Sequence, residues 1–239
     1  MNICLQIQNL NYQLNNQSIL ENISFEVEKG DYIGLLGPNG GGKTTLIKVI
    51  LGILEPTSGS VNTFNSKIGY LPQHLNSSGL DFPATVLEIV LTGLKPRLLD
   101  FEYKKKRNLA FQFLEKLDII ELKDKRLNQL SGGQRQRVLI ARSLISQPDI
   151  IILDEPTAPI DAKSQAKFYD FLRTMNSENN LTIILISHDI SAITKEVKKV
   201  FFLNQKLECY HNIEEFNRPE NLQNLFGTSN TILNHNHHH

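Results

Sequence analysis

The sequence has few cysteines and no excess of charge of either sign. Its two cysteines, Cys4 and Cys209, are far apart and show neither metal-ligand spacing nor a CxxC motif. We therefore expect two reduced thiols, as in a cytosolic protein. The 25 basic residues equal the 25 acidic residues in number, so no overall field attracts the protein to nucleic acid or to an acidic membrane surface.

The sequence also lacks long hydrophobic runs. The two most apolar stretches, 150–153 and 181–186, fall far below the length of about 20 residues that a membrane-spanning helix needs. The N-terminal residues alternate in polarity and include no basic segment, so we expect no signal peptide. If the protein acts at a membrane, we expect another chain to cross it.

Strand-like and helical segments alternate along the chain. Segments 3–7, 23–27 and 32–36 are typical of strands, and a glycine-rich loop then opens a helix near Gly42. The pattern is mostly helical from about 82 to 147. This order predicts helices inserted between the strands of an α/β protein.

Two buried-type strands follow, 150–153 and 181–186, with a helical segment between them. Strands joined by crossover helices predict a mainly parallel sheet that is covered on both faces. We expect one domain, 1–226, and a histidine-rich tail that lacks a packed core. The predicted ranges are 1–73 and 148–226 for the core of the domain, about 74–147 for its helical lobe, and 227–239 for the tail.

The glycine-rich loop has the pattern of a phosphate-binding P-loop between a strand and a helix. Glycines let consecutive backbone N–H groups converge on an anion at the positive end of a helix dipole. Lys43 adds a full positive charge toward the β- and γ-phosphates, and the Thr44 hydroxyl suits Mg²⁺. The residues expected to bind nucleotide here are Gly37, Pro38, Asn39, Gly40, Gly41, Gly42, Lys43, Thr44 and Thr45.

Two carboxylates end the apolar strand 150–153. Ligands bind at the carboxyl ends of strands in open α/β folds, so we expect Asp154 and Glu155 near the P-loop. Asp154 suits Mg²⁺, and Glu155 is then free to act as the general base on the attacking water. Two acids at a strand end are also common at solvated turns, so this assignment depends on the P-loop.

A further glycine motif, Leu130-Ser-Gly-Gly-Gln134, precedes a basic helix. With the P-loop, Gln73, the acidic strand end and Ser187-His188-Asp189 in this order, the chain resembles the ATP-binding subunits of ABC transporters over nearly its whole length. The resemblance implies an α/β P-loop NTPase (RecA-like) core with an N-terminal antiparallel β subdomain and an inserted α-helical lobe. A general P-loop ATPase shares only the P-loop and the acidic strand end.

The resemblance implies further roles. Gln73 is expected to reach Mg²⁺ and the attacking water, and His188 to contact the γ-phosphate. With Lys43 and Glu155, these two residues form the expected catalytic set. The glycine motif is expected to cradle the γ-phosphate of ATP held by the other subunit of an ATP-bound homodimer. Its residues are Ser131, Gly132, Gly133 and Gln134.

The chain departs from the family pattern at two places. The aromatic residue that stacks on adenine is expected near Leu14, which is not aromatic. Tyr12 lies two residues away on the same strand face, and it is the candidate to take this role. The second departure is Pro159-Ile160, where family members more often have Gly-Leu.

The segment Asp81–Gly93, together with Gly37–Lys43, resembles the importers that take up zinc, manganese or iron. The resemblance implies a separate membrane permease, a separate substrate-binding protein and a place at the cytoplasmic face of the cell membrane. Four of the seven histidines lie at the C-terminus, which fits either a native metal-binding tail or the remnant of a purification tag. The alternative function is that of a soluble ABC ATPase in an assembly system, such as iron–sulfur cluster assembly.

Overall fold

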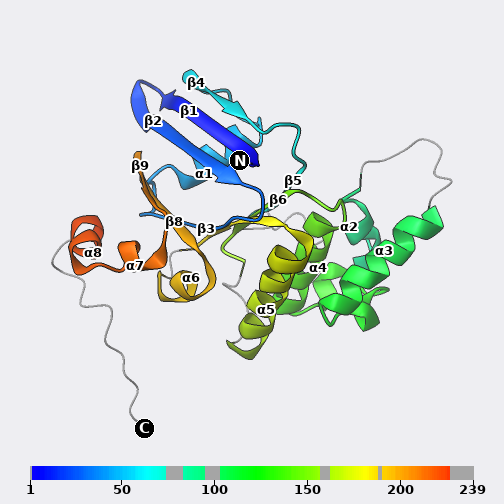
Figure 1. The fold of residues 1–239 in the computed structure, drawn as a ribbon. Helices are drawn as coiled ribbons and strands as arrows, with labels where there is room; N and C mark the ends of the chain where they lie inside the picture. Colours follow the sequence, from blue (N-terminus) through cyan, green and yellow to red (C-terminus); the bar gives the residue numbers. More distant parts are fainter. Residues whose placement is uncertain (1, 74–82, 95–102, 157–161, 188–189, 227–239) are drawn as a thin grey trace, which may run out of the picture.

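The structure, a computed structural model, describes residues 2–73, 83–94, 103–156, 162–187 and 190–226. The described chain forms a small antiparallel sheet, a larger and mainly parallel sheet, and helices packed around them (Figure 1). The α/β class and the N-terminal antiparallel sheet predicted from the sequence are therefore confirmed.

Three strands form the small sheet in the order β2-β1-β4. β1 (Ile3–Leu14) and β2 (Gln17–Glu28) pair along most of their length, and β4 (Ser58–Asn62) pairs with the other edge of β1. The predicted segments 3–7 and 23–27 cover only parts of β1 and β2. The remaining parts, toward the hairpin between the two strands, are mostly exposed or half-buried and carry little of the apolar alternation that reveals a strand.

Six strands form the larger sheet in the order β5-β6-β7-β3-β8-β9. All neighbours run parallel except β8 and β9, which are antiparallel. Every residue of β3, β6 and β7 is buried, as expected for central strands covered on both faces. The strands are β3 (Tyr32–Leu36), β5 (Ile68–Leu71), β6 (Ile150–Asp154), β7 (Thr182–Ile186), β8 (Lys199–Asn204) and β9 (Lys206–Tyr210).

Helices cover both faces of the larger sheet. The buried side chains of α1 (Lys43–Ile50) belong to one core cluster with side chains of both sheets, and Figure 1 shows α1 between the sheets. The other helices contribute to a second core cluster. They are α2 (Val86–Leu91), α3 (Tyr103–Lys116), α4 (Gly132–Leu144), α5 (Ala162–Asn179), α6 (Ile190–Glu196), α7 (Ile213–Phe216) and α8 (Pro219–Phe226), with 3₁₀ turns at Ile120–Leu122 and Leu127–Gln129.

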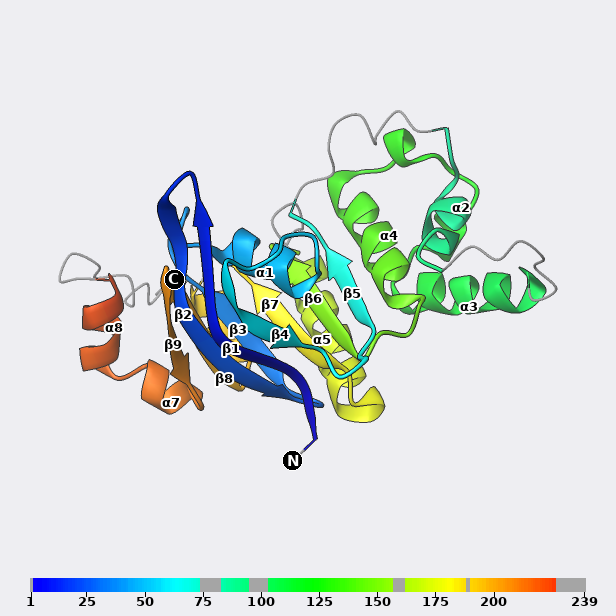
Figure 2. The same cartoon turned by 90° about the horizontal axis from the view of Figure 1, so that it is seen from above.

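Helices α2, α3 and α4 lie together at one side of the molecule, away from the antiparallel sheet (Figure 2). A capping box starts α2: Glu88 N–H donates to Thr85 Oγ1, and Thr85 N–H donates to Glu88 Oε2. The lobe boundaries at 74 and 147 stay predictions, since 74–82 lie outside the described residues. In the described ranges, no helix combines the length and the apolarity needed to cross a membrane.

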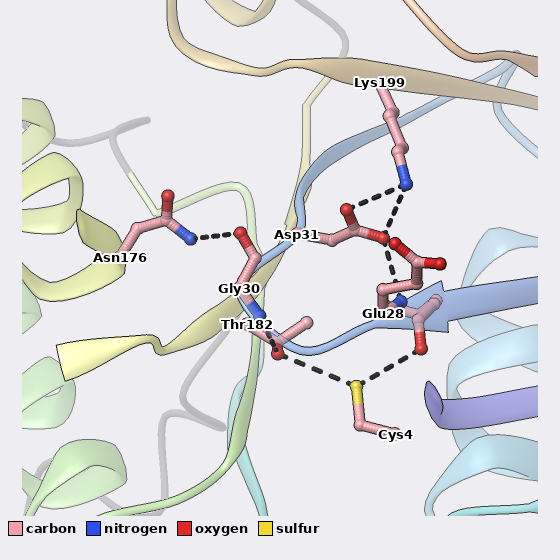
Figure 3. Close-up of polar contacts among 8 residues, drawn as sticks. Cys4, Glu28, Gly30, Asp31, Asn176, Thr182 and Lys199 are labelled. Atoms are coloured by element: carbon pink, nitrogen blue, oxygen red, sulfur yellow. Dashed lines mark hydrogen bonds and ion pairs between the residues drawn. The ribbon is translucent and has the colours of Figure 1, made fainter. Parts of the chain in front are cut away.

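A polar junction fixes the turn between β2 and β3 (Figure 3). Gly30 N–H donates to Thr182 Oγ1 over 3.1 Å, and Asn176 Nδ2 donates to the Gly30 carbonyl over 2.9 Å. The Asp31 carboxylate pairs with Lys199 Nζ at 2.8 Å. These contacts join the antiparallel sheet to β7, β8 and α5, at the end of β3 opposite to the P-loop.

Both cysteines are free thiols, as the sequence predicts. Cys4 is buried with its Sγ 3.7 Å from Thr182 Oγ1, and burial raises the pKa of its thiol. Burial also raises the pKa of Cys209, to about 11. Both thiols are therefore protonated at neutral pH and react slowly.

Candidate functional site

The P-loop connects the end of β3 to the start of α1. Gly37 and Gly42 have φ angles of +145° and +99°, which glycine adopts far more readily than other residues. A Cβ at Gly37 would collide with the Leu203 carbonyl oxygen, so the loop has no room for a side chain there. Gly42 is the N-cap of α1, whose first N–H groups lack partners within the helix. The order of strand, glycine loop and helix is as predicted.

The Lys43 ammonium lies over this loop. Its Nζ donates to the carbonyl oxygens of Gly37 and Pro38, each over 2.8 Å. Burial lowers the pKa of Lys43, and the nearby carboxylates of Asp154 and Glu155 oppose this shift. The lysine is therefore held between the phosphate loop and the acidic end of β6.

Most of the other predicted nucleotide-binding residues lie on the open side of the loop, whereas Gly41 is buried against the Leu203 carbonyl. Pro38, Asn39 and Gly40 are exposed, and a Cβ at Gly40 would meet no atom within 4 Å. Thr44 is exposed in the first turn of α1, whereas Thr45 is half-buried. This side leaves the room that a phosphate group needs.

Asp154 and Glu155 lie at the carboxyl end of β6, which β7 separates from β3. Asp154 is only 7% exposed. Glu155 has a φ of +49°, which is uncommon for a residue other than glycine. Its N–H donates to the Ile186 carbonyl over 2.9 Å, so the last residue of β7 holds the backbone of the predicted base. Such backbone strain is typical of functional sites.

Gln73 contacts Glu155 directly. Its Nε2 donates to Glu155 Oε2 over 2.8 Å, although the two residues are 82 positions apart. Gln73 follows β5, and Leu71 of β5 is paired in parallel with Leu153 of β6. The two strands therefore end side by side and bring the predicted glutamine to the predicted general base.

Ser131 is the N-cap of α4. Gln134 N–H donates to Ser131 Oγ over 3.3 Å, and Ser131 N–H donates to Gln134 Oε1 over 3.0 Å. This capping box does not use the N–H groups of Gly132 and Gly133. They lie in the first turn of α4, where backbone N–H groups can bind an anion. α4 lies with α2 and α3 (Figure 2), whereas α1 lies between the sheets (Figure 1). The two glycine motifs thus belong to different parts of the fold.

Three predictions on further site residues stay untested. His188 and Pro159-Ile160 lie outside the described residues. Tyr12 is half-buried on β1, pairs with Leu20 of β2 and packs against the core between the sheets. Leu20 also lies against the P-loop, since a Cβ at Gly42 would be 2.8 Å from Leu20 Cδ2. Leu20 therefore connects Tyr12 to the P-loop. Its stacking on adenine stays a prediction.

The sequence did not indicate one neighbour of the P-loop, the turn between β8 and β9. Gln205 N–H donates to the Gly41 carbonyl over 3.0 Å, and the Leu203 carbonyl lies against Gly37 and Gly41. Backbone groups make these contacts, so no residue type in the turn marks them. The polar Asn204-Gln-Lys206 turn is the one local signal.

The glycine loop with its lysine at a helix N-terminus, and the two acids that end a nearby parallel strand, define a P-loop nucleoside triphosphatase. A family described as ABC transporter matches residues 20–158. The chain belongs to this family, and its site is that of an ATP-binding and ATP-hydrolysing cassette.

Known proteins are similar to this chain over most of its length. A "Probable metal transport system ATP-binding protein" from Thermotoga maritima is 39% identical over 93% of this chain and 90% of its own length. The "Zinc uptake system ATP-binding protein ZurA" of Listeria innocua is 37% identical over 87% of this chain and 85% of its own length. A dimeric ATP-binding cassette, solved in a post-hydrolysis state with ADP and Pi, is 27% identical with a TM-score of 0.76, covering 87% of this chain and 98% of that chain. The P-loop NTPase fold is thereby confirmed.

We expect Gly37→Ala to unfold at a clearly lower temperature than Gly40→Ala. Both glycines have positive φ, so both variants carry a backbone penalty of about 1 kcal/mol or more. Only the Cβ at position 37 would also collide with the Leu203 carbonyl, whereas the Cβ at position 40 would enter open space. Thermal unfolding followed by circular dichroism measures the difference. Equal midpoints for the two variants would show that Leu203 does not restrict the loop.

Proposed function

We propose that this chain hydrolyses ATP to drive the uptake of a divalent metal ion, zinc or manganese, through a separate permease. The hydrolytic part is carried by one observation: the Gln73 amide is hydrogen-bonded to Glu155 at the strand edge next to the P-loop lysine. The metal is supported by two relatives, 39% and 37% identical, whose names refer to metal transport and zinc uptake.

Residues of the site fit both ATP and Mg²⁺. The Thr44 hydroxyl, the Asp154 carboxylate and the Gln73 amide oxygen are the hard oxygen donors that Mg²⁺ prefers. The Gln73 amide nitrogen donates to Glu155, and the amide oxygen takes no part in that bond. Mg²⁺ bound by these groups would neutralise charge on the β- and γ-phosphates. The Lys43 ammonium, now on two loop carbonyls, would move to the phosphate oxygens.

The carboxylate of Glu155 takes the proton of the attacking water in this proposal. The water oxygen bonds to the γ-phosphorus while the bond from that phosphorus to the bridging oxygen breaks, which yields ADP and phosphate. Gln73 already contacts the base and so orients the water beside it. His188 is assigned the contact with the γ-phosphate.

The placement of the two glycine motifs supports a dimer. The capping box engages the side chains of Ser131 and Gln134 and leaves the N–H groups of Gly132 and Gly133 for an anion. These residues lie on the helical side of the fold, apart from the P-loop (Figure 2). A γ-phosphate bound by Lys43 of one chain and this motif of another would join two copies, and hydrolysis would weaken the joint. A similar cassette was solved as a dimer with ADP and Pi, which supports the pairing of two copies.

The transport path belongs to other chains in this proposal. A permease crosses the membrane, a substrate-binding protein delivers the ion, and this chain acts at the cytoplasmic face. We assign 1–73 and 148–226 to the ATPase core and about 74–147 to the lobe that docks on the permease. The histidine-rich segment 227–239 lies outside the described residues, and metal binding there stays a prediction.

Glu155→Gln is expected to form a stable dimer in ATP and Mg²⁺. The substitution removes the base and lowers turnover by about 10²-fold or more, while the groups that bind phosphate remain. Light scattering after size-exclusion chromatography measures the mass with and without ATP. Glu178→Gln is the control, since Glu178 is exposed on α5, and it should behave as wild type. A Glu155→Gln protein that stays monomeric with ATP would contradict the dimer.

Affinity purification from native membranes, with this chain as bait, tests the transport proposal. We expect a polytopic permease to co-purify, because a transport ATPase must be bound to the chain that it drives. Mass spectrometry identifies the partners, and the identity of the permease narrows the choice of ion. Recovery of only soluble assembly proteins would favour the assembly ATPase, and the hydrolytic site would be unaffected.

A further inference from the structure

We propose that Gln205, in the turn between β8 and β9, is a positioning residue for the nucleotide. Its N–H donates to the Gly41 carbonyl over 3.0 Å, and its own carbonyl accepts from Glu21 N–H over 2.8 Å. One residue thus links the phosphate loop to β2 of the antiparallel sheet. This role rests on nucleotide binding at the P-loop, as proposed above.

The bond to Gly41 sets the direction of the next N–H group. In a trans peptide the carbonyl and the following N–H point to opposite sides, and the described residues contain no cis peptide. Because the Gly41 carbonyl is held on Gln205, the N–H of Gly42 points to the other side of the loop. Gly42 is the N-cap of α1, the place where backbone N–H groups bind phosphate. The orientation of one phosphate-binding group therefore depends on the turn.

The carbonyl of Leu203 supports the loop from the same side. It occupies the space where Gly37 and Gly41 would carry side chains, whereas nothing lies within 4 Å of a Cβ at Gly40. The end of β8 and the turn after it thus pack against one side of the P-loop and leave the side at Gly40 open. Lys206 of β9 and Glu21 of β2 form an ion pair at 3.8 Å, but this pair is exposed and contributes little to stability.

The backbone at Gln205 is strained, so a substitution there can disturb the bond to Gly41 and test its role. Its φ is +59°, a region that costs a side-chain-bearing residue about 1 kcal/mol or more and is worst for β-branched residues. Gln147 is a matched control: its φ is +50°, and its N–H donates to the Leu144 carbonyl over 2.8 Å. It precedes β6, so it lies at the end of the parallel sheet opposite to the P-loop.

The test compares the full-length variants Gln205→Val, Gln205→Gly and Gln147→Val in ADP with Mg²⁺. Isothermal titration calorimetry gives the affinity, and thermal unfolding gives the stability. We expect Gln205→Val to bind ADP about fivefold more weakly, the effect of losing one backbone hydrogen bond. Gln205→Gly should bind as wild type, because glycine adopts the positive φ. Gln147→Val should lose stability and keep wild-type affinity. In ATP turnover, Gln205→Val should raise KM more than it lowers kcat.

Equal ADP affinity of Gln205→Val and wild type would overturn the proposal, as would an equal loss of affinity in Gln147→Val. If Gln205→Val does not fold, Gln205→Ala and Gln147→Ala are compared instead, with the same two criteria. Wild-type protein that binds neither ADP nor ATP would contradict nucleotide binding itself and would remove the basis of this role.

Discussion

The parallel pairing of β3, β5, β6 and β7 is the constraint on which the site depends. Parallel strands end at the same edge of a sheet, so the P-loop after β3 and the acids after β6 meet there. The same pairing carries Gln73, which follows β5, to Glu155. The site therefore needs no long-range side-chain network to assemble.

Backbone groups, rather than side chains, then shape the site. The Ile186 carbonyl holds the N–H of Glu155, and the turn between β8 and β9 holds the Gly41 carbonyl. Glu155 and Gln205 both have positive φ although neither is glycine. Strained residues persist where the surrounding structure over-determines them, which is the situation at both places. The sheet thus fixes the backbone of Glu155, the predicted base, and one wall of the P-loop.

How much of this follows from sequence depends on how local each signal is. The P-loop, the acidic end of β6 and the capping boxes at Thr85 and Ser131 are short patterns with a direct physical cause, and they could be predicted. The polar ends of β1 and β2 could not, because little apolar alternation marks them. The turn at Gln205 acts through its backbone, which no residue pattern records. The Gln73–Glu155 contact joins residues 82 positions apart, so only the structure could show how close the two side chains lie.

In the proposed dimer, the P-loop of one chain and the Ser131 motif of another form one site. Mixing Lys43→Ala protein with Ser131→Arg protein tests it directly, by ATP hydrolysis at varied ratios. Each variant alone should be inactive. An equal mixture should regain about a quarter of wild-type activity, because half of the dimers are mixed and each has one intact site of two. No activity at any ratio would contradict the shared site, since both motifs would then serve the same chain.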